Sequence, residues 1–278
     1  MFPPKKILFA VDFSEGARAM ARTVREWAER CDAEVKVVHA LNVDPPDAYA
    51  PNAAEAREKL NTLISEGLMG CDLVVHLSPG DPALTIVDIA RQGSSDLIMM
   101  PTRGHGAFVR SLLGSVTAEV LHDAPCPVWT SAHQQPGPAY RGPGIRTVLC
   151  AVDLSSRSSL VLQAAVQTAQ LWQAQVVRLA HVMELSRSSN KDDWTRERRE
   201  QVTSAVEGQL RQLAEQAGGM PLVEVLEGSP IKEVIDAAER CHADLIVVGR
   251  TQVLEDEGQP KSTAYGIIAG SHCPVLSV

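Results

Sequence analysis

One stretch of the chain, from Asp96 to Val128, combines glycines, hydroxyl groups and cations at a spacing that could hold a phosphate. An apolar run at 97–100 is typical of a short buried strand, and the loop Pro-Thr-Arg-Gly-His-Gly follows it at 101–106. Nine residues then separate Gly104 from Gly114, and Ser115 is typical of a helix N-cap. A strand, a glycine loop and a helix start present backbone N–H groups and a positive helix end to an anion.

The side chains of this loop leave its role open. Arg103, His105 and Arg110 add positive charge, which suits a phosphate and equally suits a solvated surface. The loop has neither the Gly-Lys-Ser/Thr of a Walker A motif nor a Gly-x-Gly-x-x-Gly fingerprint. Its glycines therefore indicate a backbone that can approach an anion closely, without identifying which anion that is.

The elements that position this loop occur twice along the chain. Five landmarks recur in the same order, at residues 7–14 and 148–155, 37–39 and 179–181, 80–82 and 228–230, 96–100 and 244–248, and 126–128 and 273–275. Such ordered self-similarity indicates a tandem duplication. We expect a first domain at 1–133 and a second at 146–278, joined by a linker at 134–145 that is rich in proline and glycine.

Each copy alternates strand and helix patterns. In the first copy, aliphatic runs predict strands at about 5–12, 35–40, 72–77, 96–101 and 127–131. Asp81 and Pro82 are typical of an N-cap and a first helical residue, because proline has no N–H to leave unpaired there. Strand–helix alternation predicts an α/β fold of two tandem, doubly wound, five-stranded parallel sheets with helices on both faces.

Composition excludes several classes of function. The 278 residues carry 26 Lys and Arg against 34 Asp and Glu, and a net charge of −8 disfavours general binding to nucleic acid or anionic membranes. The apolar run near the N-terminus stops at Asp12, too early for a signal peptide. Six cysteines without a Cys-x-x-Cys pair suggest reduced thiols, and the eight histidines show no metal-ligand spacing. We therefore expect a cytoplasmic protein.

The loop and its surroundings resemble a known family signature. Gly104, nine residues, Gly114-Ser115-Val116 and then Pro-Cys-Pro-Val at 125–128 are similar to the signature of the universal stress protein family. ATP-binding members of that family carry Gly-x-x-Gly, nine residues and Gly-Ser/Thr. Pro101 replaces the first of these glycines, so one backbone N–H of the pattern is missing here.

The resemblance implies a strand order of 3-2-1-4-5 in each copy and an adenine-nucleotide site in the first. Asp12, together with backbone at the end of the second strand, would hold the nucleoside opposite the glycine loop. The alternative role for Asp12 is structural, as a turn-forming residue before the Ser14 N-cap. The implied binding residues are Ala10, Asp12, Val38, Thr102, Arg103, Gly104, His105, Gly106, Gly114, Ser115 and Val116.

The bound molecule would be ATP, ADP or AMP. Mg²⁺ or Mn²⁺ could bridge its phosphates, with Thr102, Ser115 or Thr117 in reach. The loop offers no evident water-orienting carboxylate, so we expect slow or absent hydrolysis and at most a weak ATPase. In the second copy Gln252 replaces a glycine and three acids follow at 255–257, which predicts weak or no nucleotide binding there.

The resemblance also implies association through short edge strands at 127–130 and 274–277. The two copies would pack about a pseudo-two-fold axis within one chain, and two chains could pair as a homodimer. A nucleotide-independent scaffold that acts through dimerisation or partner binding is the main alternative function. A phospho-accepting receiver would need an Asp at the end of the third strand and a lysine after the fifth, and both are missing here. A nucleotide-activating enzyme would need a Ser-Gly-Gly-x-Asp-Ser or His-x-Gly-His motif, and neither occurs.

Overall fold

The computed structural model describes residues 3–41, 49–102, 113–131, 144–184, 196–218, 220–250 and 263–278. In the first half, strands and helices alternate as β1 (Lys6–Ala10), α1 (Glu15–Cys31), β2 (Glu34–Leu41), α2 (Tyr49–Gly67), β3 (Leu73–Pro79), α3 (Pro82–Gly93), β4 (Leu97–Met100), α4 (Ser115–Asp123) and β5 (Val128–Thr130). The predicted strand positions agree with these bounds to within about two residues, as is usual for element ends.

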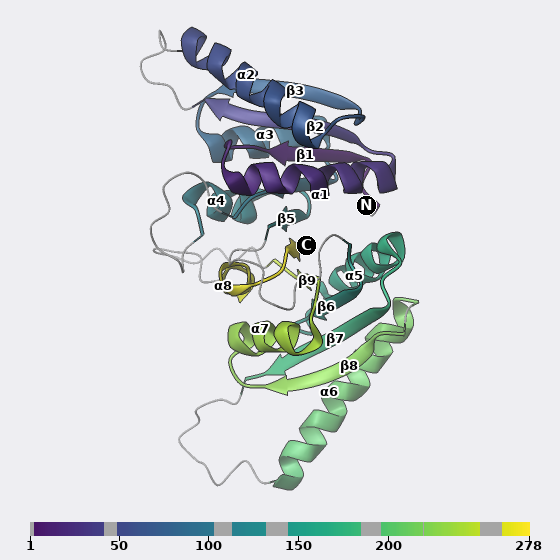
Figure 1. Ribbon diagram of the computed structural model, residues 1–278. Helices are drawn as coiled ribbons and strands as arrows, with labels where there is room; N and C mark the ends of the chain where they lie inside the picture. The colour runs from purple at the N-terminus through teal and green to yellow at the C-terminus, as the bar shows by residue number, and fades with distance from the viewer. Residues whose placement is uncertain are drawn as a thin grey trace.

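The second half repeats this sequence of elements (Figure 1). They are β6 (Thr147–Ala151), α5 (Ser158–Trp172), β7 (Val176–Met183), α6 (Arg196–Gln216), β8 (Leu222–Glu227), α7 (Pro230–Cys241), β9 (Leu245–Val248), α8 (Thr263–Gly270) and β10 (Val275–Ser277). The predicted α/β class with tandem copies is confirmed. None of the helices in the described ranges is both long and apolar enough to cross a membrane.

The two five-stranded sheets of the halves join edge to edge into one continuous sheet. Within the described residues the order is β3-β2-β1-β4-β5-β10-β9-β6-β7-β8, with ten strands in total. Neighbours within each half are parallel, whereas β5 and β10 pair antiparallel, with Trp129 opposite Leu276. β5 and β10 pair because each is the short outer strand of its half, with N–H and C=O groups that the other strand can satisfy.

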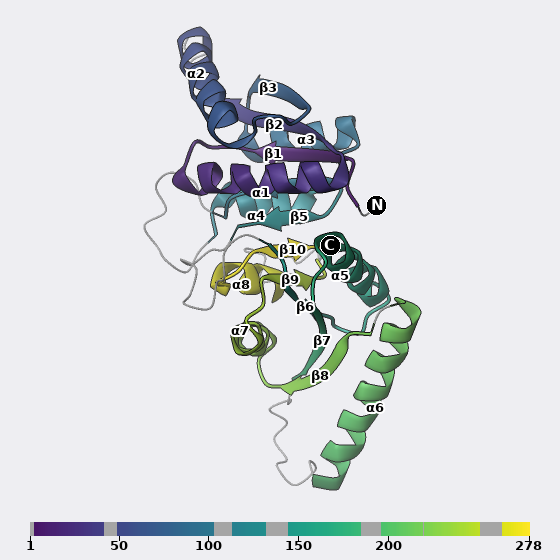
Figure 2. The ribbon, with the colours of Figure 1, turned by 45° about the vertical axis from the view of Figure 1, so that its right-hand side comes forward.

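Both faces of the sheet are covered by helices (Figure 2). On β1, Ile7 and Phe9 face the layer that contains α1, α2, α5 and α6, while Leu8 and Ala10 face the layer that contains α3, α4, α7 and α8. Alternate residues of a strand point to opposite faces, so a strand buried on both sides is apolar throughout. The helices of the two halves thus continue one another on each face.

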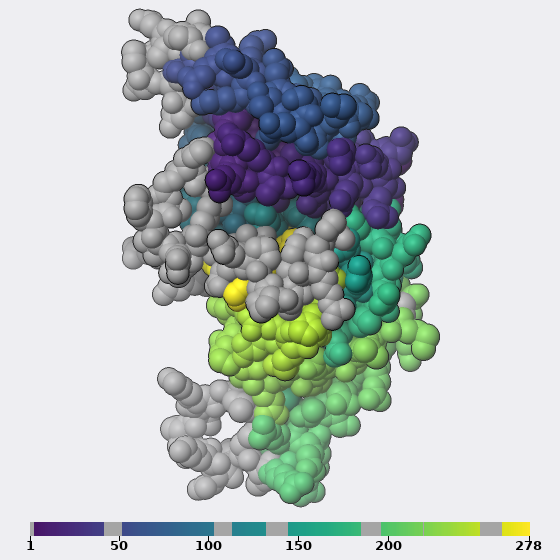
Figure 3. All heavy atoms as spheres, viewed as in Figure 1, coloured from purple at the N-terminus to yellow at the C-terminus, as the bar shows by residue number. Residues whose placement is uncertain are grey.

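Aromatic side chains from both halves meet next to the β5–β10 pair. The ring centroid of Trp27 in α1 lies 5.7 Å from that of Trp172 in α5 and 5.4 Å from that of Trp129 in β5. The guanidinium carbon of Arg30 lies 4.4 Å from the Trp172 ring centroid, a cation–π distance. Figure 3 shows the teal residues of α5 adjoining the purple residues of α1 along this boundary.

Two helical glycines allow a matched test of the packing. A Cβ at Gly67 would lie 2.5 Å from Cβ of Ala21, where α2 approaches α1, whereas a Cβ at Gly208 in α6 meets nothing within 4 Å. Gly67→Ala should lower the free energy of unfolding by about 1–3 kcal/mol through overpacking. Gly208→Ala should raise it by about 0.5–1 kcal/mol, because glycine weakens a helix interior. Urea denaturation of both variants checks this, and equal effects would contradict the α1–α2 contact.

Candidate functional site

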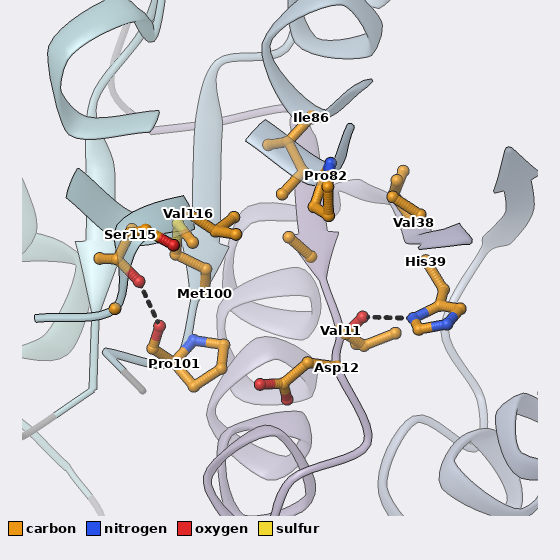
Figure 4. Close-up of a pocket in the computed structure, with 14 residues that line it drawn as sticks. Val11, Asp12, Val38, His39, Pro82, Ile86, Met100, Pro101, Ser115 and Val116 are labelled. Atoms are coloured by element: carbon orange, nitrogen blue, oxygen red, sulfur yellow. Dashed lines mark hydrogen bonds between the residues drawn. The ribbon is translucent and has the colours of Figure 1, made fainter. Parts of the chain in front are cut away.

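A cavity lies beyond the carboxyl ends of β1 and β4 (Figure 4). This is where the strand order reverses, and ligands of open parallel sheets bind at such a crevice. Its volume of about 390 Å³ lies within the roughly 300–1,000 Å³ typical of small-molecule sites. The lining residues are Ala10, Val11, Asp12, Val38, His39, Ala40, Pro82, Ile86, Met100, Pro101, Gly114, Ser115, Val116 and Thr117.

Asp12 lies at the turn that leads from β1 into α1. The next residue, Phe13, has a φ of 62°, in the left-handed region that bulky residues rarely adopt. Its second-half counterpart, Leu154, has a φ of 61°, so the turn is built in the same way twice. The backbone N–H of Ser14 donates to Oδ1 of Asp12 at 3.0 Å. Asp12 is thus a turn residue that also lines the cavity, and no described residue donates to its Oδ2.

The first turn of α4 opens onto the same cavity. Gly114 is the N-cap, with a φ of −62° and no side-chain capping hydrogen bond, and Ser115 is the first helical residue. This corrects the prediction that Ser115 is the cap. The N–H of Gly114 donates to the carbonyl of Thr102 at 3.2 Å, which fixes where the helix begins. The first N–H groups of any helix lack intrahelical partners, so here they remain available to an acceptor.

The three hydroxyl side chains predicted to reach a metal have different surroundings. Thr117 is buried, and its Oγ1 donates to the carbonyls of Pro101 and Thr102, at 3.2 and 3.4 Å. Thr102 is also buried and is not among the residues that line the cavity, so its part in the site stays a prediction. The side chain of Ser115 is exposed. Ser115 is therefore the hydroxyl best placed for a ligand.

Most of the predicted site residues in the described ranges come together. Ala10, Asp12, Val38, Gly114, Ser115 and Val116 all line the cavity. Arg103, Gly104, His105 and Gly106 lie outside the described residues. Ile86 and Met100 also line the cavity, although neither was among the predicted site residues. The signal for them was the apolar pattern of α3 and the end of β4, both of which lie at this edge of the sheet.

His39, near the end of β2, forms part of the cavity wall. Its Nδ1 lies 2.8 Å from the carbonyl oxygen of Val11, so Nδ1 carries the proton and donates. The ring centroid lies 4.3 Å from that of Phe13. Burial lowers the pKa of His39 below its usual 6.5, although the bond to Val11 opposes this. In the second half, His181 makes the same contact with the carbonyl of Val152, at 2.8 Å.

The second half has a cavity at the equivalent edge, with a volume of about 780 Å³. Its walls include charged groups of both signs, from Asp153, Arg157, Glu184 and Arg250. Oδ1 of Asp153 accepts from the N–H of Ser155 at 2.9 Å and from the hydroxyl of Ser158 at 3.2 Å. Burial would raise the pKa of Asp153, but these hydrogen bonds lower it overall. Asp153 thus accepts two hydrogen bonds from its own turn and helix, whereas Asp12 accepts one from the described residues.

Comparisons with known proteins identify a family. The model of the universal stress protein family matches the chain twice, at residues 3–131 and 144–278. A universal stress protein of Thermus aquaticus is 33% identical over 133 residues, which cover 45% of this chain and 96% of that protein. One of Methanocaldococcus jannaschii is 30% identical over 137 residues, covering 45% of this chain and 79% of its own length.

Solved structures agree with the fold over the whole length. A universal stress protein from Archaeoglobus fulgidus matches with a TM-score of 0.72 and 21% identity, covering 98% of this chain and 95% of that one. A structure from Pseudomonas aeruginosa described as a putative universal stress protein matches with a TM-score of 0.69 and 16% identity, covering 99% and 93%. At such identities the likeness supports the architecture alone.

The buried position of His39 predicts a pH dependence of stability. Because its folded-state pKa lies below 6.5, the unfolded chain binds the proton more readily as the pH falls through 6.5. His39 should therefore make the free energy of unfolding fall on acidification below that pH. His39→Gln should flatten this part of the profile, measured by urea denaturation at several pH values. An unchanged slope, or an NMR titration of His39 at or above 6.5, would contradict the assignment.

Proposed function

The chain belongs to the universal stress protein family, and we propose that its first half binds ATP, or another adenine nucleotide, as a sensor or regulator of a stress response. The observation that carries the proposal is the start of α4, which lacks a side-chain cap and opens onto the cavity near Asp12. Free N–H groups at a helix start attract anions, and a phosphate is the anion of a nucleotide.

The nucleoside part fits the inner walls of the cavity. Val38, Ile86 and Met100 offer an apolar slot for a purine, as the side chains in Figure 4 illustrate. Oδ2 of Asp12 would accept a hydrogen bond from a ribose hydroxyl or from the adenine amino group. Small-molecule sites commonly combine an apolar lining with a few placed polar groups in this way.

The phosphates would bind at the first turn of α4, to the N–H groups of Ser115 and Val116 and the hydroxyl of Ser115. In the described part of the chain, His, Cys, Asp and Glu side chains do not gather in threes as a metal site. A Mg²⁺ or Mn²⁺ ion would therefore take most of its ligands from phosphate oxygens and water, as Mg²⁺ commonly does. Such an ion would neutralise phosphate charge.

Hydrolysis is proposed to be slow or absent. Asp12 is the carboxylate among the residues that line this cavity, and the proposal uses it for the nucleoside. Phosphoryl transfer needs a positioned water or hydroxyl nucleophile near the terminal phosphate, together with a base to accept its proton. The proposed phosphate site at the first turn of α4 consists of backbone N–H groups and the hydroxyl of Ser115, none of which is a base at neutral pH. Tight binding with little turnover suits a sensor better than an enzyme.

The second half is proposed to bind nucleotide weakly and to serve the first structurally. Arg157 and Glu184 place opposite charges on its cavity, and Asp153 already accepts two hydrogen bonds. The β5–β10 pair and the Trp27–Trp172 contact support a stable intrachain association of domains 1–133 and 146–278. A cytoplasmic location and a possible further homodimer belong to the same proposal.

A nucleotide-independent scaffold is the alternative, and Pro101 favours it. Proline lines the cavity where the family pattern has a glycine, and it offers no N–H to a phosphate. Mass spectrometry of small molecules released from protein purified without added nucleotide separates the two functions. A stoichiometric adenine nucleotide supports the sensor, whereas its absence together with no thermal shift in millimolar ATP supports the scaffold.

Gly114→Ala tests the phosphate contact. A Cβ there would lie 3.7 Å from the Thr102 carbonyl oxygen, an ordinary contact, so the fold should lose no more than about 1 kcal/mol of stability. ATP affinity measured by calorimetry should fall about 10- to 100-fold, because a methyl group at position 114 would hinder the close approach of a phosphate to the N–H groups of Ser115 and Val116, and a hydrogen bond to a charged group is worth about 1.5–3 kcal/mol. Unchanged affinity would show that the phosphates bind elsewhere.

Asp12→Asn and Asp153→Asn form a matched pair that identifies the binding half. Asparagine keeps an oxygen for the N–H of Ser14 or Ser155 but loses the carboxylate charge. Asp12→Asn should weaken ATP binding about tenfold, and Asp153→Asn should leave it unchanged, because a hydrogen bond to a charged group is worth about 1.5–3 kcal/mol. The reverse pattern in calorimetry would assign the nucleotide to the second half.

A further inference from the structure

Arg250 of the second half contacts a helix of the first half. It lies two residues beyond the last residue of β9, and its backbone N–H donates to the carbonyl of Val278 at 2.8 Å. Its guanidinium donates to the carbonyls of Leu121 and Cys126, both at 2.8 Å, and to that of Ala124 at 3.4 Å. All three acceptors lie at the C-terminal end of α4 or just beyond it.

This contact satisfies groups that a helix leaves unpaired. The last carbonyls of a helix have no intrahelical donor, and its C-terminal end carries partial negative charge. Burial lowers the pKa of Arg250 to about 10, with the nearby Cys126 acting in the opposite sense, so the side chain stays charged at neutral pH. A half-buried, charged, planar donor that binds three carbonyls holds this end of α4 in place.

The opposite end of α4 forms the proposed phosphate site. The nine residues of α4 span roughly 13 Å at 1.5 Å per residue, so the helix is a short rigid rod between Arg250 and the nucleotide cavity. Arg250 also lines the cavity of the second half. One side chain thus borders the second cavity and anchors a helix of the first.

The equivalent position in the first half is Thr102, two residues beyond β4, and it is buried beneath the first turn of its own α4. A threonine side chain is too short to bind several carbonyls of the opposite half. At this pair of positions, the contact among the described residues runs from the second half to the first.

We propose that Arg250 is a positioning residue for the nucleotide site of the first half, and that the second half supports binding in the first through this side chain. The inference rests on the proposed function, because it needs the first turn of α4 to bind phosphate. A degenerate second half that supplies Arg250 would act as a built-in partner for the first. Its loss would loosen α4 without removing any group that touches the nucleotide.

A matched pair of variants in the full-length chain tests the inference. Arg250→Ala removes the anchor from the other half, and Arg91→Ala removes an exposed arginine of the first half that donates to the carbonyl of Asp123 at 3.1 Å, also at the end of α4. Arg250→Ala should weaken ATP binding in calorimetry about 5- to 100-fold, and Arg91→Ala should change it less than about twofold, as for an exposed contact.

Two further measurements separate positioning from general destabilisation. Arg250→Lys keeps the charge and should recover part of the lost affinity. Backbone hydrogen exchange without nucleotide should be faster in α4 of Arg250→Ala than in α4 of Arg91→Ala, with β1 and β4 unchanged. If Arg250→Ala does not fold, the Arg250→Lys variant carries the test, with an intermediate affinity expected.

The outcomes distinguish failure of the inference from failure of the proposed function. If the unsubstituted chain binds ATP and Arg250→Ala binds it equally well, the inference alone is overturned. If the unsubstituted chain does not bind ATP, the proposed function is overturned and the inference with it. Equal losses in Arg250→Ala and Arg91→Ala would also overturn the inference, because any disturbance at the end of α4 would then have the same effect.

Discussion

The N–H groups at the first turn of α4, which have no side-chain cap from Gly114, set the main constraint on the described part of this protein. Gly114 provides no side-chain acceptor for them, whereas α1 and α3 are capped by Ser14 and Asp81. A helix start left open at the edge of a parallel sheet requires water or a ligand as its acceptor. The residues around this helix start form an apolar slot with one carboxylate, that of Asp12, and this lining determines which ligand can bind.

The ten-stranded sheet places this helix start within reach of the second half. Pairing of β5 with β10 brings the outer strands of the two halves together, and the helices on each face continue across the junction. The end of α4 therefore lies beside the loop that follows β9, where Arg250 can bind its carbonyls. The duplication thus keeps two folds of the same kind, and in our proposal only the first of them binds nucleotide.

Local patterns in the sequence were sufficient for the elements and for much of the site. The aliphatic runs located the strands, and Asp81 with Pro82 located the start of α3, where the carboxylate accepts from the N–H of Leu84 at 2.9 Å. Asp12 could be placed at the cavity because the carboxyl ends of parallel strands meet at one edge, whereas Val38 was implied by the family resemblance. These features depend on spacing along a short stretch of chain.

Features that depend on distant partners could not be predicted in this way. The burial of Thr102 follows from its position under α4. The sequence Gly114-Ser115 did not indicate that glycine would be the N-cap, because serine is the more usual cap residue. The joining of the two sheets through β5 and β10 was implied by the family resemblance, and no local pattern of either strand specifies its partner. Likewise, the local sequence around Arg250 predicts only a surface cation after a strand. Its three carbonyl partners belong to the other half of the chain, so they become apparent only in the folded structure.

The most direct test of the central claim is the electron density of crystals soaked in millimolar ATP with Mg²⁺. The account predicts phosphate density within hydrogen-bonding distance of the N–H groups of Ser115 and Val116, with the nucleoside beside Asp12 and against Met100. Density for solvent alone in this cavity, or for a nucleotide bound only in the second half, would contradict it.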